Sequence, residues 1–136
     1  MGPNDTDVVR VFTTNAGGGI GDVTFEVGAG APDFEVRVDA EAGSAVFAGG
    51  PQFRTSIVLR DITQNDDIPF APADFSGNVN SAAWPTAAHT FVYTVTASGL
   101  AGRENHICEA RAFVVVGITD QDASFATSPT FLLTGP

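Results

Sequence analysis

Two stretches of this chain alternate strictly between apolar and polar side chains, and this alternation limits the fold more than any other feature. They span residues 22–27 and 33–39. Their apolar members are Val23, Phe25, Val27, Phe34, Val36 and Val38. A period of two is that of a β-strand with one buried and one solvated face, as antiparallel sheets show. We therefore expect two strands here, joined by a hairpin-type loop over 28–32.

The same period recurs on both sides of a glycine-bearing turn at 98–102. Before the turn, Phe91, Tyr93, Val95 and Ala97 alternate with polar residues or valine; after it, small or apolar residues occupy every second position of 106–116. Two such runs separated by turn residues indicate an antiparallel pair with one dry face.

Shorter strands are expected at 8–13, 53–62 and 130–134, with a weaker edge strand at 44–48. Apolar residues nowhere recur at spacings of three and four, so we expect no helix. Residues 63–89 hold prolines and turn formers, which predicts a long irregular loop that is either functional or hides a short element. The sequence thus predicts one all-β domain over 1–136, an antiparallel two-sheet sandwich of about seven to nine strands.

The chain is acidic, with 16 Asp and Glu against six Arg, no Lys and a net charge of −10. Such a surface repels phosphate backbones and anionic membranes, so we expect neither nucleic acid as a partner nor membrane insertion. Cys108 is the only cysteine, which excludes an intrachain disulfide, and its inward position suggests a small buried hydrophobe.

No apolar run reaches membrane-spanning length, and the N-terminus lacks the pattern of a signal peptide. Met1-Gly2-Pro3 could be native or a remnant of processing. The compartment is therefore left open, including that of a mature exported or cell-surface protein.

The C-terminal third resembles a known family of β-sandwiches. Leu100 to His106 is followed by Cys108, Ala110 and Ala112 at alternate positions, and 128–134 has the form of a closing strand. This arrangement is similar to fibronectin type III and related immunoglobulin-like domains, although His106 stands where that family has a tyrosine. The resemblance implies a binding or spacer module rather than an enzyme.

The acidic turn at 61–70 is a candidate metal site. It resembles the calcium-binding linker of cadherins, and its candidate ligands are Asp61, Asn65, Asp66 and Asp67. Closely spaced carboxylates and amides supply the oxygens that Ca²⁺ prefers. The alternative is a solvated turn whose side chains cap their own backbone, with no cofactor bound.

Aromatic residues in the same irregular region are candidates for binding a partner. Phe70, Phe75 and Trp84 would form a platform for a sugar ring or a protein groove if they were exposed together. The alternative is that they fold back as lids over an open end of the sandwich.

We expect no catalysis. The two histidines, His89 and His106, lack metal-ligand spacing with another donor, and no Gly-x-Ser-x-Gly elbow is present. His106 is expected to be held by a hydrogen bond rather than to act as a base.

Apolar residues also fall on the face that the alternation assigns to solvent. They are Val58, Ile62, Ile107, Phe113 and Val115. A row of this kind indicates a surface that a partner or the long loop covers. The leading hypothesis is a non-catalytic recognition or assembly module that binds a protein. The alternatives are an oligomeric structural subunit, such as a phage, capsid-like or surface component, and a calcium- or carbohydrate-binding domain.

Overall fold

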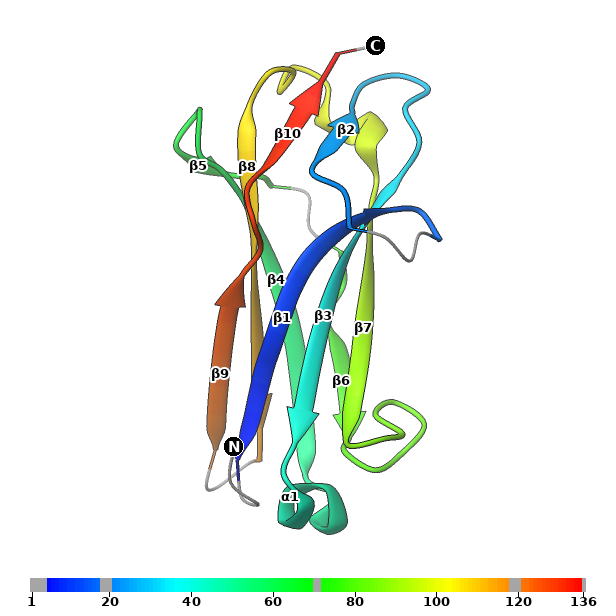
Figure 1. Ribbon diagram of the computed structural model, residues 1–136, viewed down its shortest axis with the longest axis vertical. Helices are drawn as coiled ribbons and strands as arrows, with labels where there is room; N and C mark the ends of the chain where they lie inside the picture. The colour runs from blue at the N-terminus through cyan, green and yellow to red at the C-terminus, as the bar shows by residue number, and fades with distance from the viewer. Residues whose placement is uncertain (1–4, 18–20, 70–71, 118–120, 136) are drawn as a thin grey trace.

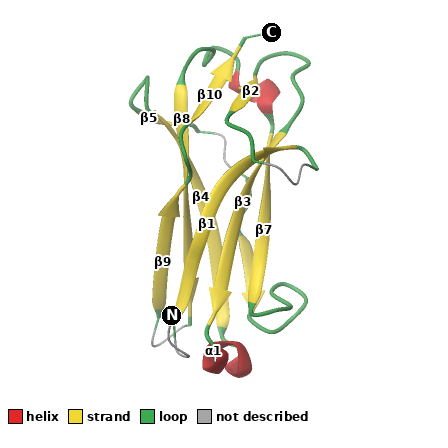
Figure 2. Ribbon diagram, viewed as in Figure 1, coloured by secondary structure: helices red, strands yellow, loops and turns green. Residues whose placement is uncertain are grey.

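The computed structural model describes residues 5–17, 21–69, 72–117 and 121–135, which form two facing β-sheets (Figures 1 and 2). In chain order the elements are β1 (Thr6–Asn15), β2 (Thr24–Glu26), β3 (Phe34–Ala42), α1 (Ser44–Gly49), β4 (Gln52–Asp61), β5 (Asp66–Asp67), β6 (Phe75–Asn78), β7 (Ala88–Val95), a 3-10 helix (Ala97–Leu100), β8 (Ile107–Val116), β9 (Asp122–Thr127) and β10 (Phe131–Thr134). The protein is an all-β sandwich, as the alternation predicts.

The order of the strands in the two sheets is that of an immunoglobulin-like sandwich. Sheet A contains β1, β3 and β7, and sheet B contains β2, β10, β8, β4 and β5, with β6 on β4 and β9 on β8. β9 and β10 pair with the same edge of β8, one after the other. The order β1-β3-β7 opposite β10-β8-β4 corresponds to strands A-B-E opposite G-F-C.

The predicted inward positions form the core. Phe34, Val36 and Val38 of β3 are at most 1% exposed, and Leu59 of β4 and Ala110 of β8 are fully buried. Sheet B supplies mainly small residues from the centre of β8, so the aromatic side chains of the facing strands have room to fill the space between the sheets.

Aromatic clusters fill the two ends of the sandwich. At the β2 end, the rings of Phe25 and Phe34 stack with centroids 4.4 Å apart, and Phe131 meets both edge-on. At the α1 end, Trp84 packs edge-on against Phe53 and Phe91. Each such ring pair adds about 0.5–1.5 kcal/mol beyond the area that it buries.

The antiparallel pair predicted across the turn at 98–102 is wrong. β7 pairs with β3 in sheet A, whereas β8 pairs with β4 in sheet B. The 3-10 helix between them buries Ala97 and Leu100 and takes the chain from one sheet to the other. Alternation indicates which side chains are buried but not which strand lies alongside.

The hairpin predicted over 28–32 is also wrong, for the same reason. β2 pairs in parallel with β10 at the edge of sheet B, and β3 pairs with β1 in sheet A. The sandwich therefore contains a parallel pair, and the loop after β2 crosses between the sheets.

Residues 44–48, predicted as an edge strand, form the helix α1 instead. Gly50 ends the helix in the left-handed conformation (φ 60°), and its N–H donates to the carbonyl of Val46. Glycine adopts that conformation without a steric penalty, which makes it a favoured helix stop. Ser44-Ala45-Val46-Phe47-Ala48 does not alternate, so the sequence offers little support for a strand.

The region at 63–89, predicted as irregular, contains two short strands, β5 and β6, which both pair with β4. The N–H of Ile68 donates to the carbonyl of Leu59, so pairing continues briefly past β5. The sequence did not predict β9, because 119–123 has the composition of an acidic turn.

Candidate functional site

The outer surface of sheet B holds a group of apolar and arginine side chains that the alternation turns toward solvent. We call this group the sheet B face. It comprises Arg54, Val58, Arg111, Phe113, Val115 and Phe125. Pairing places these residues in adjacent rows across β4, β8 and β9. The outward apolar positions predicted for Val58, Phe113 and Val115 therefore form one continuous surface.

An exposed aromatic pair lies at the centre of this face. Phe113 and Phe125 are directly opposite each other on β8 and β9, and their rings stack with centroids 5.8 Å apart. Phe113 is 38% exposed and Phe125 63% exposed. Large aromatic side chains are mostly buried in proteins, and an exposed pair in an apolar row is typical of an interaction surface.

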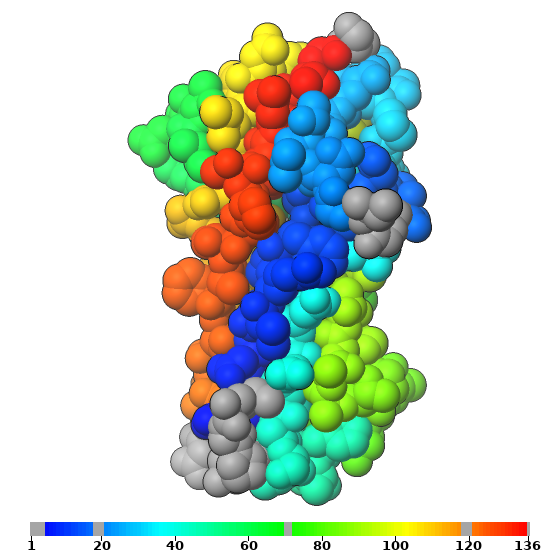
Figure 3. All heavy atoms as spheres, in the orientation of Figure 1, coloured from blue at the N-terminus to red at the C-terminus, as the bar shows by residue number. Residues whose placement is uncertain are grey.

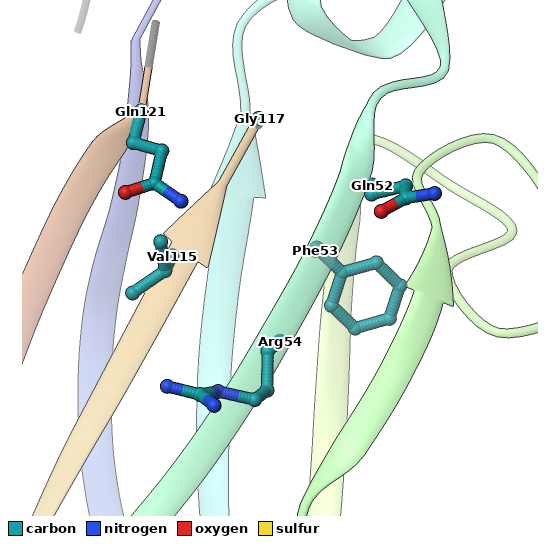
Figure 4. A pocket seen from close by; sticks show the side chains of 6 residues that line it. All are labelled: Gln52, Phe53, Arg54, Val115, Gly117 and Gln121. Carbon is teal, nitrogen blue, oxygen red and sulfur yellow. The ribbon is translucent and has the colours of Figure 1, made fainter. Parts of the chain in front are cut away.

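A shallow hollow of about 330 Å³ lies at the α1 end of the face (Figure 4). Arg54 and Gln121 lie on either side of Val115 there, and the guanidinium of Arg54 reaches across toward β8. Among the described residues Arg54 makes no ion pair, in contrast to Arg111, which binds Glu109 at 3.0 Å. The hollow thus offers a positive charge beside an apolar floor.

A second apolar group lies at the β2 end of sheet B. Leu132 pairs with Ile107, and the N–H of Ile62 donates to the carbonyl of Ile107. All three side chains are exposed. The outward positions predicted for Ile62 and Ile107 are therefore confirmed, and apolar surface extends along sheet B beyond the sheet B face.

Two arginines hold the residues of the candidate calcium site in two separate pairs. Asp61 is fully buried and accepts hydrogen bonds from Arg103 and from His106 Nδ1, both at 2.7 Å. The same Arg103 also donates to both carboxylate oxygens of Asp66 at 2.9 and 3.2 Å. A buried carboxylate with this many donors is stabilised in its charged form.

The other two candidate ligands are held in the same way. Arg60 donates to Asn65 at 2.6 Å and to Asp67 at 3.1 Å. In the described parts of the chain, no three His, Cys, Asp or Glu side chains are grouped so as to hold a metal ion. The calcium site stays a prediction, and binding would require Ca²⁺ to displace two arginines from their partners.

The charge of Asp61 follows from its surroundings. Burial by itself raises the pKa of Asp61, but hydrogen bonds from the Gln64 N–H, His106 and Arg103 outweigh that effect, so the pKa lies below the usual 3.8. The hydrogen bond from Arg103 likewise lowers the pKa of Asp66. The hydrogen bonds of Asp61 and Asp66 to Arg103 and His106 therefore connect the β4–β5 turn to the segment before β8.

The aromatic candidates are divided between the core and the surface. Trp84 is fully buried, and its indole N–H donates to the carbonyl of Ala87, as the lid alternative predicts. Phe75 is partly exposed and packs against Phe91 and Tyr93. Phe70 lies outside the described residues. The structure therefore does not bring Trp84 and Phe75 together as one exposed platform.

The remaining reactive groups are each held by neighbouring side chains or buried. His106 is held by Asp61, as expected, and His89 packs edge-on against Phe91. Cys108 is fully buried, and burial raises the pKa of its thiol to about 12. A thiol in that state is a poor nucleophile.

Sequence reasoning missed the parts that Phe125 and Arg54 play in the sheet B face. The outward set of β9 is Ala123, Phe125 and Thr127, which alternates with Asp122, Ser124 and Ala126. That alternation could have indicated a strand, but the rule that apolar residues face inward would have assigned Phe125 to the core. The outward direction of Arg54 follows from its place between the inward Phe53 and Thr55, but its position beside Val115 depends on the pairing of β4 with β8.

Comparison with known proteins finds similarity in structure but not in sequence. No family model and no curated protein matches the chain. Among solved structures, the chain is similar to AggA, the major subunit of aggregative adherence fimbriae type I from Escherichia coli, at 13% identity and a TM-score of 0.48, over 98% of this chain and 97% of that chain. A similarity of this degree does not indicate a function, so the fold assignment rests on the strand order given above. No helix among the described residues is long and apolar enough to span a membrane.

Proposed function

We propose that this protein is a non-catalytic structural subunit that associates with further copies of itself through the sheet B face. The observation that supports this most is the stacked, solvent-exposed pair of Phe113 and Phe125, with Val115 and Val58 in the adjacent rows of the sheet. Leaving these side chains in water costs about 25 cal/mol per Å² of apolar surface, which association would recover.

The way in which the reactive groups are held supports the non-catalytic part of the proposal. His106, Asp61 and Arg103 satisfy one another, and Cys108 is enclosed between the sheets. The sandwich presents its apolar and charged residues on flat outer faces, which suits contact with another folded surface. Membership of the fibronectin type III family within the immunoglobulin-like sandwiches remains a prediction.

Light scattering at increasing protein concentration tests the proposal. We expect the weight-average mass of the wild-type protein to rise between about 5 and 300 µM, the range in which interfaces of modest size associate. The double variant Phe113→Ser, Phe125→Ser should stay monomeric over that range.

A matched control shows whether the effect is specific to the sheet B face or follows from the loss of any exposed apolar side chain. Val23 is 50% exposed beside β2, away from the sheet B face, and Val23→Ser should associate as the wild type does. A wild-type protein that stays monomeric, or a double variant that associates normally, would show the proposal to be wrong. Thermal unfolding of each variant confirms that it is folded.

A further inference from the structure

We infer that the sheet B face binds the outer face of sheet A of the next copy. Each contact then joins two different faces, and the assembly is open-ended. This inference rests on the proposed function and adds the identity of the second surface. Figure 3 shows that second surface, with β1, β3 and β7 side by side.

The outer face of sheet A has an unbalanced negative charge at its α1 end. Asp7 of β1 is directly opposite Glu41 of β3, and neither forms an ion pair within the described part of the chain. Like charges at directly opposite positions destabilise a sheet. An arginine of a neighbouring copy would relieve the repulsion between Asp7 and Glu41.

An exposed apolar side chain lies beside these carboxylates. A register shift between Val8 and Arg10 leaves Val9 outside the regular pairing, and Val9 is 57% exposed. Val9, Glu41 and Ala88 help to line a shallow hollow of about 380 Å³. This face thus combines an apolar residue with negative charge that no arginine of its own sheet neutralises.

The sheet B face has the complementary combination. Arg54 lies beside Val115 in its hollow without an ion pair among the described residues, whereas Arg111 is already paired with Glu109. Glu41 lies close to the start of α1 and Arg54 close to its end, so both hollows lie at the α1 end of the sandwich, on opposite sheets. One copy can therefore be stacked on the next in the same orientation.

Charge disfavours the symmetric alternative. A dimer that places two sheet B faces against each other would bring the Arg54 side chains of both copies into one interface without a carboxylate to pair with them. Complementary potentials promote association, whereas like charges oppose it. An interface between two different faces leaves one of each free at the ends of a row, so it permits open-ended assembly rather than closed pairs.

The size of the faces sets the concentration at which association should occur. Three strands of about ten residues span roughly 34 by 14 Å, or about 480 Å² of flat surface for each copy. Roughly twice that area in total is at the low end for specific interfaces. We therefore expect association in the micromolar range and strong weakening by salt.

Sedimentation velocity of charge-reversed variants tests the inference. At about 20 mM NaCl, wild-type protein should form species larger than dimers, and about 500 mM NaCl should reduce them. Arg54→Glu and Glu41→Arg should each weaken association by about threefold to tenfold. An equimolar mixture of these two variants should associate as the wild type does, because the carboxylate introduced in one variant would meet the guanidinium introduced in the other.

The remaining outcomes separate this inference from the proposed function. Glu26→Arg changes the net charge as Glu41→Arg does, at an exposed position on β2, and should leave association unchanged. Association that stops at dimers, that is indifferent to Glu41→Arg, or that the mixture fails to restore would overturn the inference alone. Association that survives Phe113→Ser, Phe125→Ser would overturn the proposed function as well.

Discussion

Asp61 shows how a single residue can resemble a metal ligand in the sequence and serve as a structural anchor in the fold. It has no exposed surface, and its carboxylate is bound by Arg103, by His106 and by the N–H of Gln64. The charge is tolerated because each oxygen has a donor. The acidic turn is therefore held in place by protein groups, with Arg103 and Arg60 in the positions that a cation would take.

Asp61→Asn should lower the free energy of unfolding by about 2–4 kcal/mol at pH 7, because Arg103 would lose its buried carboxylate partner. Since the pKa of Asp61 is lower in the folded protein than the usual 3.8, its contribution is complete above that value and is lost as the pH falls through the folded-state pKa. Urea unfolding at several pH values should show the difference between wild type and variant shrinking below about pH 4.

Asp67→Asn is the control for this measurement. Asp67 bonds to Arg60, but its side chain is 64% exposed, and exposed ion pairs contribute little. We expect a change below about 0.5 kcal/mol. Equal effects of the two substitutions would contradict the role given to Asp61.

At the scale of elements, the sequence predicts which residues are buried far better than which strands are neighbours. The inward sets of β3, β4, β7 and β8 follow from alternation, because side-chain direction is a local property of a strand. Pairing is decided by the chain as a whole, so the predicted hairpins at 28–32 and 98–102 are both crossings between the sheets. The calcium site predicted from the acidic turn stays a prediction, and Arg103, which binds Asp61 and Asp66, is distant in sequence and could not be identified as their partner.

The β6–β7 connection closes the α1 end of the sandwich, with Trp84 as its anchor. Because Trp84 is fully buried against Phe53 and Phe91, Trp84→Ala should destabilise the fold by about 3–5 kcal/mol. Trp84→Phe should cost much less, since it keeps an aromatic ring in the same space. Chemical denaturation followed by circular dichroism measures both, and equal stability of wild type and Trp84→Ala would contradict the lid assignment.

The hydrogen bonds of the β4–β5 turn lead us to expect that the protein does not bind calcium there. Because Arg60 and Arg103 occupy the oxygens of the candidate ligands, we expect millimolar Ca²⁺ to leave the thermal midpoint unchanged relative to a chelator. A ligand that binds the native state must raise that midpoint. A rise in the wild type that disappears in Asp66→Asn would establish the calcium site and contradict our description of the turn.

At the scale of the whole molecule, the outer faces of the two sheets differ in the charge that is left unpaired. On sheet B, Arg60 pairs with Asp67 and Arg111 with Glu109, whereas Arg54 forms no ion pair among the described residues. Sheet A carries Asp7, Glu35, Asp39 and Glu41 on β1 and β3, with Arg10 and Arg37 pairing two of them. A molecule with one apolar, arginine-bearing face and one acidic face is suited to joining copies of itself.

The most direct test of self-association through the sheet B face is to move the only tryptophan onto it. In the double variant Trp84→Phe, Phe125→Trp, the indole replaces a side chain that is largely exposed in the single subunit. We predict that its fluorescence maximum shifts to shorter wavelength as the protein is concentrated from about 1 to 300 µM, because a neighbouring copy covers it. Emission that stays at the wavelength of a water-exposed indole throughout that range, in a protein shown to be folded, would contradict the account.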